Sequence, residues 1–392
     1  MMALMPEHAV VVGGGIAGLA AAVALQRRSW RVTVLERNPS VSEVGAGITL
    51  WSNALRALDA LGLGGRIRDL GLVQGSGGIR DSRGRWLAHT DTEALAARFG
   101  DGMVVLERGE LLAALRDACC DVQVRTSAEV RTVDTEGTVT IGAPGHAGDS
   151  VRGDVVIGAD GVRSVVREAL WPLATVRSTG MLAARLVGRL TTPGTVQGGE
   201  SWGRGDYAGV APLPDGRLYA YLVSPVTSGV PSEPGEALGW FQQRFASWHY
   251  PLPQLLASVE PSQLLVNELV DLAPLDTLLR GRTVLVGDAA HAMTPNLGQG
   301  ACQALEDAVE LATALGTATD NDITRRLQTY DRRRRPRVHR IARRSRSAGT
   351  AASLRGRIPT AVRNALVSAV PGTLSLRAFD AIVDWQPPTN SP

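Results

Sequence analysis

The stretch His8–Asn38, "HAVVVGGGIAGLAAAVALQRRSWRVTVLERN", decides the fold of this 392-residue chain. A short apolar run predicts a strand at Val10–Val12, a glycine-rich turn follows it, and Ala20–Leu25 predicts the body of a helix. Val32–Leu35 predicts a second strand, which ends at Glu36. A strand, a glycine turn, a helix and a second strand in this order are typical of the first unit of a parallel α/β sheet.

The turn carries Gly13, Gly15 and Gly18 at the spacing of a G-x-G-x-x-G motif. The first glycine permits a tight turn, the second lets the backbone approach a pyrophosphate, and the third lets the helix pack closely on the strand. The N–H groups at the helix N-terminus then face the phosphates. Glu36 stands 18 residues beyond Gly18, where a carboxylate accepts hydrogen bonds from ribose hydroxyls and disfavours a 2′-phosphate. The motif therefore predicts a site for FAD or NAD, and these residues alone do not choose between the two.

Composition excludes several classes of protein. The net charge is only +3, and 44% of the residues are hydrophobic, as in an ordinary globular protein. No apolar run reaches the roughly 20 residues that cross a bilayer. Cys119, Cys120 and Cys302 show neither a disulfide framework nor metal-ligand spacing. We therefore expect a cytoplasmic protein with no integral membrane segment and no metal site.

A second motif lies in the middle of the chain. Val155–Leu170 reads "VVIGADGVRSVVREAL". It predicts a strand, a tight turn at Asp160 and Gly161, and a helix that carries Arg163 and Arg167.

A third motif lies near the C-terminal end. Val284–Ala312 reads "VLVGDAAHAMTPNLGQGACQALEDAVELA". It predicts a strand at Val284–Val286, Asp288 at the end of that strand, a proline-bearing loop, and a long helix that begins near Gly300. This is a second glycine-rich loop, some 270 residues after the first.

With these three motifs in this order, the chain resembles the group A flavoprotein monooxygenases, the FAD-dependent hydroxylases related to p-hydroxybenzoate and salicylate hydroxylases. Four further segments resemble that family: "VGAGITL", "LERGELLAAL", "WGRG…APLPDGR" and "DWQPP", at Val44–Leu50, Leu106–Leu115, Trp202–Arg217 and Asp384–Pro388. The resemblance implies an α/β fold with a Rossmann-like FAD-binding domain of the glutathione-reductase-like, three-layer ββα type. An inserted β-sheet substrate domain and C-terminal helices complete that fold.

The resemblance also implies a division of the chain into domains. Residues 1–72, 98–175 and 268–345 are expected to form the FAD-binding domain. Residues 73–97 and 176–267 are expected to form the substrate domain, and residues 346–392 a C-terminal helical segment.

The resemblance further implies FAD contacts from both ends of the chain. Asp288 is expected to hydrogen-bond the ribityl chain, and Gly298–Ala301 to present backbone N–H groups to the flavin ring at a helix N-terminus. Ser52 stands where relatives commonly have proline, which leaves the conformation of the preceding loop open. The full expected set is Gly13, Gly15, Ala17, Gly18, Glu36, Arg37, Thr49, Arg108, Val130, Asp160, Asp288, Gly298, Gln299, Gly300 and Ala301.

The activity that the resemblance implies is a monooxygenase reaction. NAD(P)H reduces the FAD, and O2 then forms a flavin C4a-hydroperoxide that hydroxylates an aromatic small molecule or epoxidises an olefinic one. Arg185 is the candidate anchor for the substrate, and Pro295 is expected to shape the reactive face together with Asn296. No second G-x-G-x-x-G motif is present for NADH or NADPH, so the choice between them stays open. Either a monomer or a homodimer is compatible with this reaction.

The substrate domain is expected to be a β-sheet. The predicted strands are Met181–Val187, Tyr207–Val210 and Leu218–Val223, with a hairpin around residues 82–84.

Three other functions were weighed against this one. All 41 basic residues are arginines, so a flavin-dependent halogenase, which needs a lysine and typically a W-x-W-x-I-P stretch, is excluded. A flavin-dependent oxidase or reductase that inserts no oxygen remains the alternative. The segment Arg325–Ser347 contains eleven arginines, which in isolation would suggest binding to a nucleic acid or a membrane surface. We favour a long exposed helix, kinked at Pro336, whose arginines pair with acids of the FAD-binding domain, and we expect no nucleic-acid partner.

Overall fold

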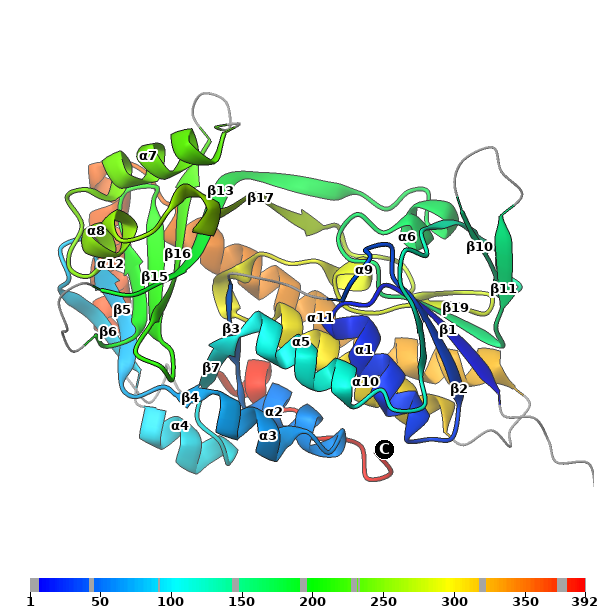
Figure 1. The fold of residues 1–392 in the computed structure, drawn as a ribbon. Coiled ribbons are helices and arrows are strands. Elements are labelled where there is room, and N and C mark those ends of the chain that lie inside the picture. Colours follow the sequence, from blue (N-terminus) through cyan, green and yellow to red (C-terminus); the bar gives the residue numbers. More distant parts are fainter. Residues whose placement is uncertain are drawn as a thin grey trace, which may run out of the picture.

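Two large β-sheets lie at opposite ends of the protein, and a long helix runs between them (Figure 1). The structure is a computed structural model. It describes residues 7–41, 46–90, 92–142, 148–190, 196–226, 231, 233–316, 322–371 and 379–391. The first two residues of the segment Val44–Leu50 therefore lie outside the described residues.

The first large sheet is mostly parallel. Its described strands number six, in the order β18-β19-β12-β1-β2-β8. Strand β1 is buried along its whole length, as expected for a strand of a parallel sheet that is covered on both faces. β1 pairs in parallel with β2 and with β12, whereas β18 is antiparallel to β19. The bounds are β1 His8–Val12, β2 Arg31–Leu35, β8 Gln123–Arg125, β12 Val155–Gly158, β18 Leu279–Arg280 and β19 Thr283–Leu285.

Helices α1 (Ile16–Gln26) and α10 (Gly300–Leu315) pack against each other beside this sheet. The alanines of α1, among them Ala20 and Ala24, are fully buried, and their small side chains allow the close approach. Helices α5 (Arg108–Asp117) and α11 (Ile323–Ala352) continue this layer. The predicted α/β fold and the predicted start of α10 are confirmed. No described helix combines the length and the apolar character needed to cross a membrane.

The second large sheet is mixed. Seven described strands follow the order β17-β13-β16-β15-β14-β5-β6, and only β14 and β5 pair in parallel. We call it the substrate-side sheet. The predicted strands and the hairpin between β5 and β6 are confirmed. The bounds are β5 Gly77–Asp81, β6 Trp86–Thr90, β13 Val176–Gly188, β14 Gly199–Trp202, β15 Tyr207–Pro212, β16 Leu218–Pro225 and β17 Leu265–Leu272.

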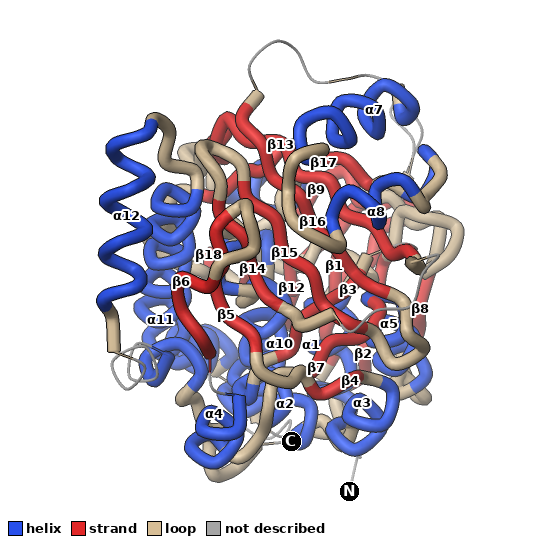
Figure 2. Tube along the Cα trace, turned by 90° about the vertical axis from the view of Figure 1, so that its left-hand side faces the viewer, coloured by secondary structure: helices blue, strands red, loops and turns tan. Residues whose placement is uncertain are grey.

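The two faces of the substrate-side sheet have different partners because successive side chains of a strand point to opposite faces. Leu182, Ala184 and Leu222 belong to the core on the outer face, under α7 (Pro234–Phe245) and α8 (Leu252–Ala257). Met181 and Ala183 belong to the core on the inner face, together with Ala352 of α11. Helix α12 (Arg357–Ala369) contacts β6 and lies beside α11 at one edge of the molecule (Figure 2).

Smaller elements connect the two large sheets. Among the described residues, β9 to β11 form one three-stranded sheet, and β3, β7 and β4 form another. Their bounds are β3 Gly47–Leu50, β4 Leu72–Val73, β7 Val104–Glu107, β9 Val130–Val133, β10 Thr138–Ile141 and β11 Asp149–Arg152. The helices are α2 Ser52–Ala60, α3 Gly64–Leu70, α4 Thr92–Phe99, α6 Val165–Leu170 and α9 Asp288–His291, with 3-10 turns η1 Pro261–Gln263 and η2 Pro295–Leu297.

Two local expectations are corrected or resolved here. Arg163 precedes α6 instead of lying in it, because Ser164 caps the helix and its Oγ accepts a hydrogen bond from the Arg167 N–H at 2.9 Å. Ser52, which replaces the proline of relatives, begins α2, and its hydroxyl donates to the Asp101 carbonyl at 3.0 Å. The described part of the preceding loop is therefore short and ends in a regular helix.

Candidate active site

The turn between β1 and α1 forms a cradle whose inner side admits no side chain. Gly13 has a φ of +106°, and a Cβ there would lie 2.5 Å from the Ala159 carbonyl oxygen. A Cβ on Gly18 would lie 1.9 Å from the Gly13 oxygen. A Cβ on Gly15 would meet nothing within 4 Å, so the outer side is open. Helix α1 has no side-chain cap and no acid in its first turn, which leaves its positive end available to an anion.

Glu36 closes one side of this cradle at the end of β2. Its side chain accepts hydrogen bonds from the Gly14 N–H at 2.7 Å and from the Asn38 N–H at 2.8 Å. The Glu36 carbonyl accepts from the Ala128 N–H at 2.8 Å, which brings the start of β9 next to it. Val130, the first residue of β9, is buried, whereas Arg37 is exposed.

Asp160 lies on the other side of the cradle. Its Cα is 3.0 Å from the position of a Cβ on Gly13. Its carboxylate accepts hydrogen bonds from the Ser164 hydroxyl at 2.5 Å and from the Val166 N–H at 3.1 Å. Burial raises the pKa of Asp160, and these hydrogen bonds oppose the rise. The structure thus places Asp160 at the cradle, with its carboxylate engaged in holding the turn into α6.

The second glycine-rich loop meets the first one. A Cβ on Gly287 would lie 2.7 Å from the Ala17 Cβ, although the two residues are 270 positions apart in the sequence. Asp288 is exposed at the start of α9, and its Oδ1 lies 4.0 Å from the position of a Cβ on Gly300. Helix α10, like α1, begins without a side-chain cap or an acid in its first turn. Two uncapped helix N-termini therefore belong to loops that touch.

Gly298 provides the close approach in the second loop. Its φ of +60° is left-handed, and a Cβ there would lie 3.1 Å from the Trp51 Nε1 and 3.8 Å from the Thr49 Cβ. The Trp51 Nε1 is buried and has no hydrogen-bond partner among the described residues. Trp51 is not part of any of the three motifs and could not be identified from them. Gln299 is fully buried, and Gly300 and Ala301 form the first turn of α10.

A row of side chains crosses the inner face of the substrate-side sheet. Arg185 lies opposite Tyr221, Tyr221 opposite Gly209, and Gly209 opposite Glu200. We call Arg185, Tyr221 and Glu200 the polar row. The Tyr221 ring lies over Gly209, where a Cβ would come within 2.2 Å of it. The Arg185 Nη2 donates to the Asn267 Oδ1 at 2.6 Å, and the Arg185 Nε is buried without a partner among the described residues.

Tyr219 connects the polar row to the FAD side. A Cβ on Gly47 of β3 would lie 2.3 Å from its ring. Burial raises the pKa of Tyr219, and the guanidinium groups of Arg185 and Arg108 oppose the rise. Arg108 is the first residue of α5, so residues of both large units converge on one tyrosine. Pro295 is exposed at the start of η2.

Beneath the second loop lies a network of buried polar side chains. The Arg334 side chain is 1% exposed and bonds Glu306 at 2.6 Å and Asp307 at 2.8 Å. Asp307 also accepts from the Gly287 N–H at 2.8 Å and lies 2.6 Å from the His291 Nε2. The side-chain amides of Asn53 and Gln303 each donate hydrogen bonds to Gln299 and to Glu306. We call the whole set the buried network: Arg334, Glu306, Asp307, His291, Asn53, Gln299 and Gln303. Of these residues only Gln299 belongs to the predicted site, so the motifs did not reveal this network.

The arginine-rich segment supplies this network from α11. Arg337 also bonds Glu306 at 2.7 Å, and Arg326 bonds Glu7 at 2.8 Å. Arg346 pairs with Asp271. The predicted long helix and the pairing of its arginines with acids are confirmed, but the helix is not exposed throughout, because Arg326 and Arg334 are buried.

The buried network predicts a specific acid sensitivity. Burial alone would raise the pKa of Asp307, but the His291 imidazole and the Arg334 guanidinium lower it to about 2 from the ordinary value of 3.8. Because the folded-state pKa is depressed, the stabilisation is present above about pH 4 and is lost as the pH falls toward 2. We expect Asp307→Asn to lower the free energy of unfolding at pH 7 by about 2 kcal/mol or more, and the difference from wild type to shrink as the pH approaches 2. Urea unfolding at several pH values measures this, with the exposed Asp121→Asn as control. A difference that stays constant with pH would contradict it.

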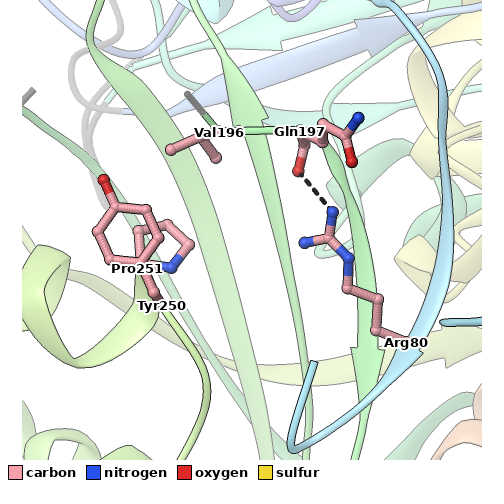
Figure 3. A pocket seen from close by; sticks show the side chains of 5 residues that line it. All are labelled: Arg80, Val196, Gln197, Tyr250 and Pro251. Carbon is pink, nitrogen blue, oxygen red and sulfur yellow. Dashed lines mark hydrogen bonds between the residues drawn. The ribbon is translucent and has the colours of Figure 1, made fainter. Parts of the chain in front are cut away.

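A shallow hollow elsewhere on the protein is separate from these residues. Arg80, Val196, Gln197, Tyr250 and Pro251 line it, and Arg80 donates to the Gln197 carbonyl at 3.4 Å (Figure 3). Arg80 lies opposite Ser201 in the β5–β14 ladder, whereas Glu200 and Trp202 point to the other face. None of the predicted site residues lines this hollow.

The residues present fit FAD. The open side of Gly15 at an uncapped helix end suits a pyrophosphate, and the Glu36 carboxylate beside this turn is a group that could accept hydrogen bonds from a ribose. At Gly298 a side chain would come too close to Trp51. The Trp51 indole N–H is buried and has no hydrogen-bond partner among the described residues. The two glycine-rich segments approach each other at Ala17 and Gly287. This arrangement suits a long cofactor that is bound by a different segment at each of its ends.

Comparisons with known proteins agree with this geometry. The family model described as "FAD binding domain" matches residues 7–190 and 273–345. An aurachin C monooxygenase/isomerase of Stigmatella aurantiaca is 35% identical over 308 residues, which cover 78% of this chain and 80% of that one. A 3-hydroxybenzoate 6-hydroxylase of Polaromonas naphthalenivorans is 34% identical over 387 residues, 96% and 94% of the two chains.

Solved structures show the same fold. The crystal structure of Klebsiella pneumoniae HpxO complexed with FAD and uric acid superposes with a TM-score of 0.83 at 27% identity, over 95% of each chain. The cradle, the second loop and these similarities lead to one conclusion: the chain belongs to the FAD-binding-domain family, among its group A FAD-dependent monooxygenases.

Proposed function

We propose that this enzyme uses FAD, NAD(P)H and O2 to hydroxylate an aromatic small molecule. The observation that carries the proposal is the contact between the two glycine-rich loops at Ala17 and Gly287, next to a sheet whose inner face carries the polar row. One named relative is a hydroxylase of 3-hydroxybenzoate, and one solved structure is of a protein crystallised with uric acid. Both of these small molecules are unsaturated ring compounds. When bound, FAD supplies the transfer of electrons from NAD(P)H to O2 and of one oxygen atom to the substrate.

We propose that the residues of the first cradle hold the ADP half of the cofactor. Gly15 leaves room for the pyrophosphate at the N-terminus of α1, and Gly13 and Gly18 allow the tight turn and the close packing behind it. Ala17 lies in the first turn of that helix. Glu36 accepts hydrogen bonds from the ribose. The other residues of this half are Arg37, Arg108, Val130 and Asp160.

The second loop holds the flavin half in this proposal. Asp288 binds the ribityl chain, and Gly298, Gln299, Gly300 and Ala301 offer backbone N–H groups beside Thr49. The positive N-terminal end of α10 stabilises negative charge on the reduced ring. Arg185 anchors the substrate, and Pro295 shapes the space above the ring and excludes water.

The domain division follows the same assignment. Residues 1–72, 98–175 and 268–345 bind FAD, residues 73–97 and 176–267 contact the substrate, and residues 346–392 form the C-terminal segment. The three cysteines are free thiols, which supports a reducing cytoplasmic location.

The decisive experiment follows both electrons and oxygen. Protein loaded with FAD is incubated with NADH or NADPH, 18O2 and a panel of aromatic compounds, and the products are analysed by mass spectrometry. We expect one compound to accelerate NAD(P)H consumption and to gain a single 18O atom. Consumption of NAD(P)H without any 18O in the product would favour the oxidase or reductase alternative, and a protein that binds no FAD would refute both.

A further inference from the structure

Buried polar atoms without partners gather at the Glu200 end of the polar row. The Glu200 Oε1 and the Trp202 Nε1 are shielded from water and have no hydrogen-bond partner among the described residues. Trp202 as a whole is only 8% exposed. A buried polar group left unpaired costs about 1 to 3 kcal/mol. The Trp202 N–H is close enough to the Glu200 carboxyl to lower its pKa, yet neither atom makes a hydrogen bond of good geometry. Two such groups, two positions apart on one face of β14, therefore indicate a place for a polar ligand.

This place lies next to the second glycine-rich loop. Tyr207 stands opposite Trp202 in the β14–β15 ladder, and the Asn296 amide and the Glu200 carboxyl both affect the pKa of Tyr207, which burial raises. Asn296 belongs to η2, between Asp288 and Gly298. The Glu200 end of the row is thus near the loop assigned to the flavin ring.

The charges around Glu200 leave its carboxyl without a cation in contact. Tyr207 and Tyr221 face it from β15 and β16. The Arg363 guanidinium of α12 lies 5.1 Å from the centroid of the Trp202 ring and donates to the Gly203 carbonyl. Arg185, at the far end of the row, bonds Asn267. Glu306 and Asp307 form salt bridges with Arg334 in the interior. Glu200 forms no such salt bridge among the described residues.

We infer that Glu200 determines substrate specificity: it accepts a hydrogen bond from an N–H or O–H donor of the aromatic substrate and excludes a ring carboxylate from that end of the polar row. This inference rests on the proposed function, because it concerns the substrate of the same site. A carboxylate accepts charge-assisted hydrogen bonds, which are about twice as strong as neutral ones, and it repels a second anion. Burial raises the pKa of Glu200 to about 7, and the nearby Trp202 indole N–H opposes the rise.

The test compares 2-naphthol with 2-naphthoate, two probes that differ only in an O–H donor against a carboxylate. Binding to the FAD-loaded protein is followed by quenching of naphthyl fluorescence, without turnover. We expect the wild type to prefer 2-naphthol and Glu200→Gln to reduce that preference about tenfold, the effect of losing one charge-assisted hydrogen bond. In the wild type the affinity for 2-naphthol should rise between about pH 6 and pH 8 as the carboxyl loses its proton, whereas Glu200→Gln should bind independently of pH.

Two variants separate this effect from a structural one. Glu236→Gln makes the same change at an exposed position of α7 and should match the wild type. Glu200→Asp keeps the carboxyl and should retain the pH dependence. FAD content and melting temperature confirm that each variant is folded.

Each outcome is informative. An unchanged preference and pH profile in Glu200→Gln overturns the inference, as does a wild type that binds no 2-naphthol or binds both probes equally. These results leave the proposed function intact, because that function fails on FAD uptake and 18O incorporation instead.

Discussion

Replacing Arg334 by methionine is expected to lower the free energy of unfolding by about 3 to 5 kcal/mol. The guanidinium is almost fully buried between Glu306 and Asp307, so its removal leaves Asp307 without a guanidinium and Glu306 with Arg337 as its only remaining cation among the described residues. Burial of an uncompensated charge is far more costly than loss of a surface pair, which contributes at most about 1 kcal/mol. Urea unfolding of the wild type and the variant at pH 7 measures the difference.

The same helix supplies the control for this prediction. Arg340 is exposed on α11, and Arg340→Met should change the free energy of unfolding by less than about 0.5 kcal/mol. In a second test, Glu306→Gln should cost less free energy of unfolding in the Arg334→Met background than in the wild type, because the removed carboxylate is then paired with Arg337 alone. Equal destabilisation by Arg334→Met and Arg340→Met would contradict the importance of the buried network.

The parts of the fold that could be predicted are those in which local sequence and tertiary structure agree. In His8–Asn38 the apolar strand, the glycine turn and the alanine-rich helix all indicate the same unit, and the structure contains it. The start of α10 near Gly300 was predicted for the same reason. The strand containing Tyr207 was predicted from its own apolar run, but its neighbour β14 is only four residues long and gave no such signal.

The parts that could not be predicted depend on pairs of residues far apart in the chain. Glu306 and Asp307 read as the polar face of an amphipathic helix, yet both are fully buried because Arg334 of the next helix reaches them. The sequence of an arginine-rich segment shows that the segment is positively charged. It does not show which of the arginine side chains are buried. Glu200 became noticeable only through the register of β14 on β15, since a one-residue shift would place it on the outer face.

Gly15→Val is expected to abolish stoichiometric FAD binding while leaving the fold intact. A Cβ at this position would meet nothing within 4 Å, and the backbone at Gly15, with φ of −78° and ψ of −174°, is extended and open to any residue. The stability of the FAD-free protein should therefore change by less than about 0.5 kcal/mol. The isopropyl group would occupy the space proposed for the pyrophosphate and separate it from the N–H groups of α1. Loss of two charge-assisted hydrogen bonds costs about 3 kcal/mol or more, which weakens FAD binding at least ~100-fold.

The contrast with two other glycines makes this prediction specific. Gly239→Val also adds a Cβ in open space, but α7 covers the outer face of the substrate-side sheet, away from α1 (Figure 1), so this variant should keep both FAD and stability. Gly18→Val should lose both, because its Cβ would come within 1.9 Å of the Gly13 oxygen and push α1 away from β1. FAD per chain is measured from the absorbance ratio of the purified proteins, and stability from unfolding after the FAD is removed. If Gly15→Val kept its FAD, the open side of the turn would not be where the pyrophosphate binds, and the cradle would be a packing feature of the β1–α1 unit.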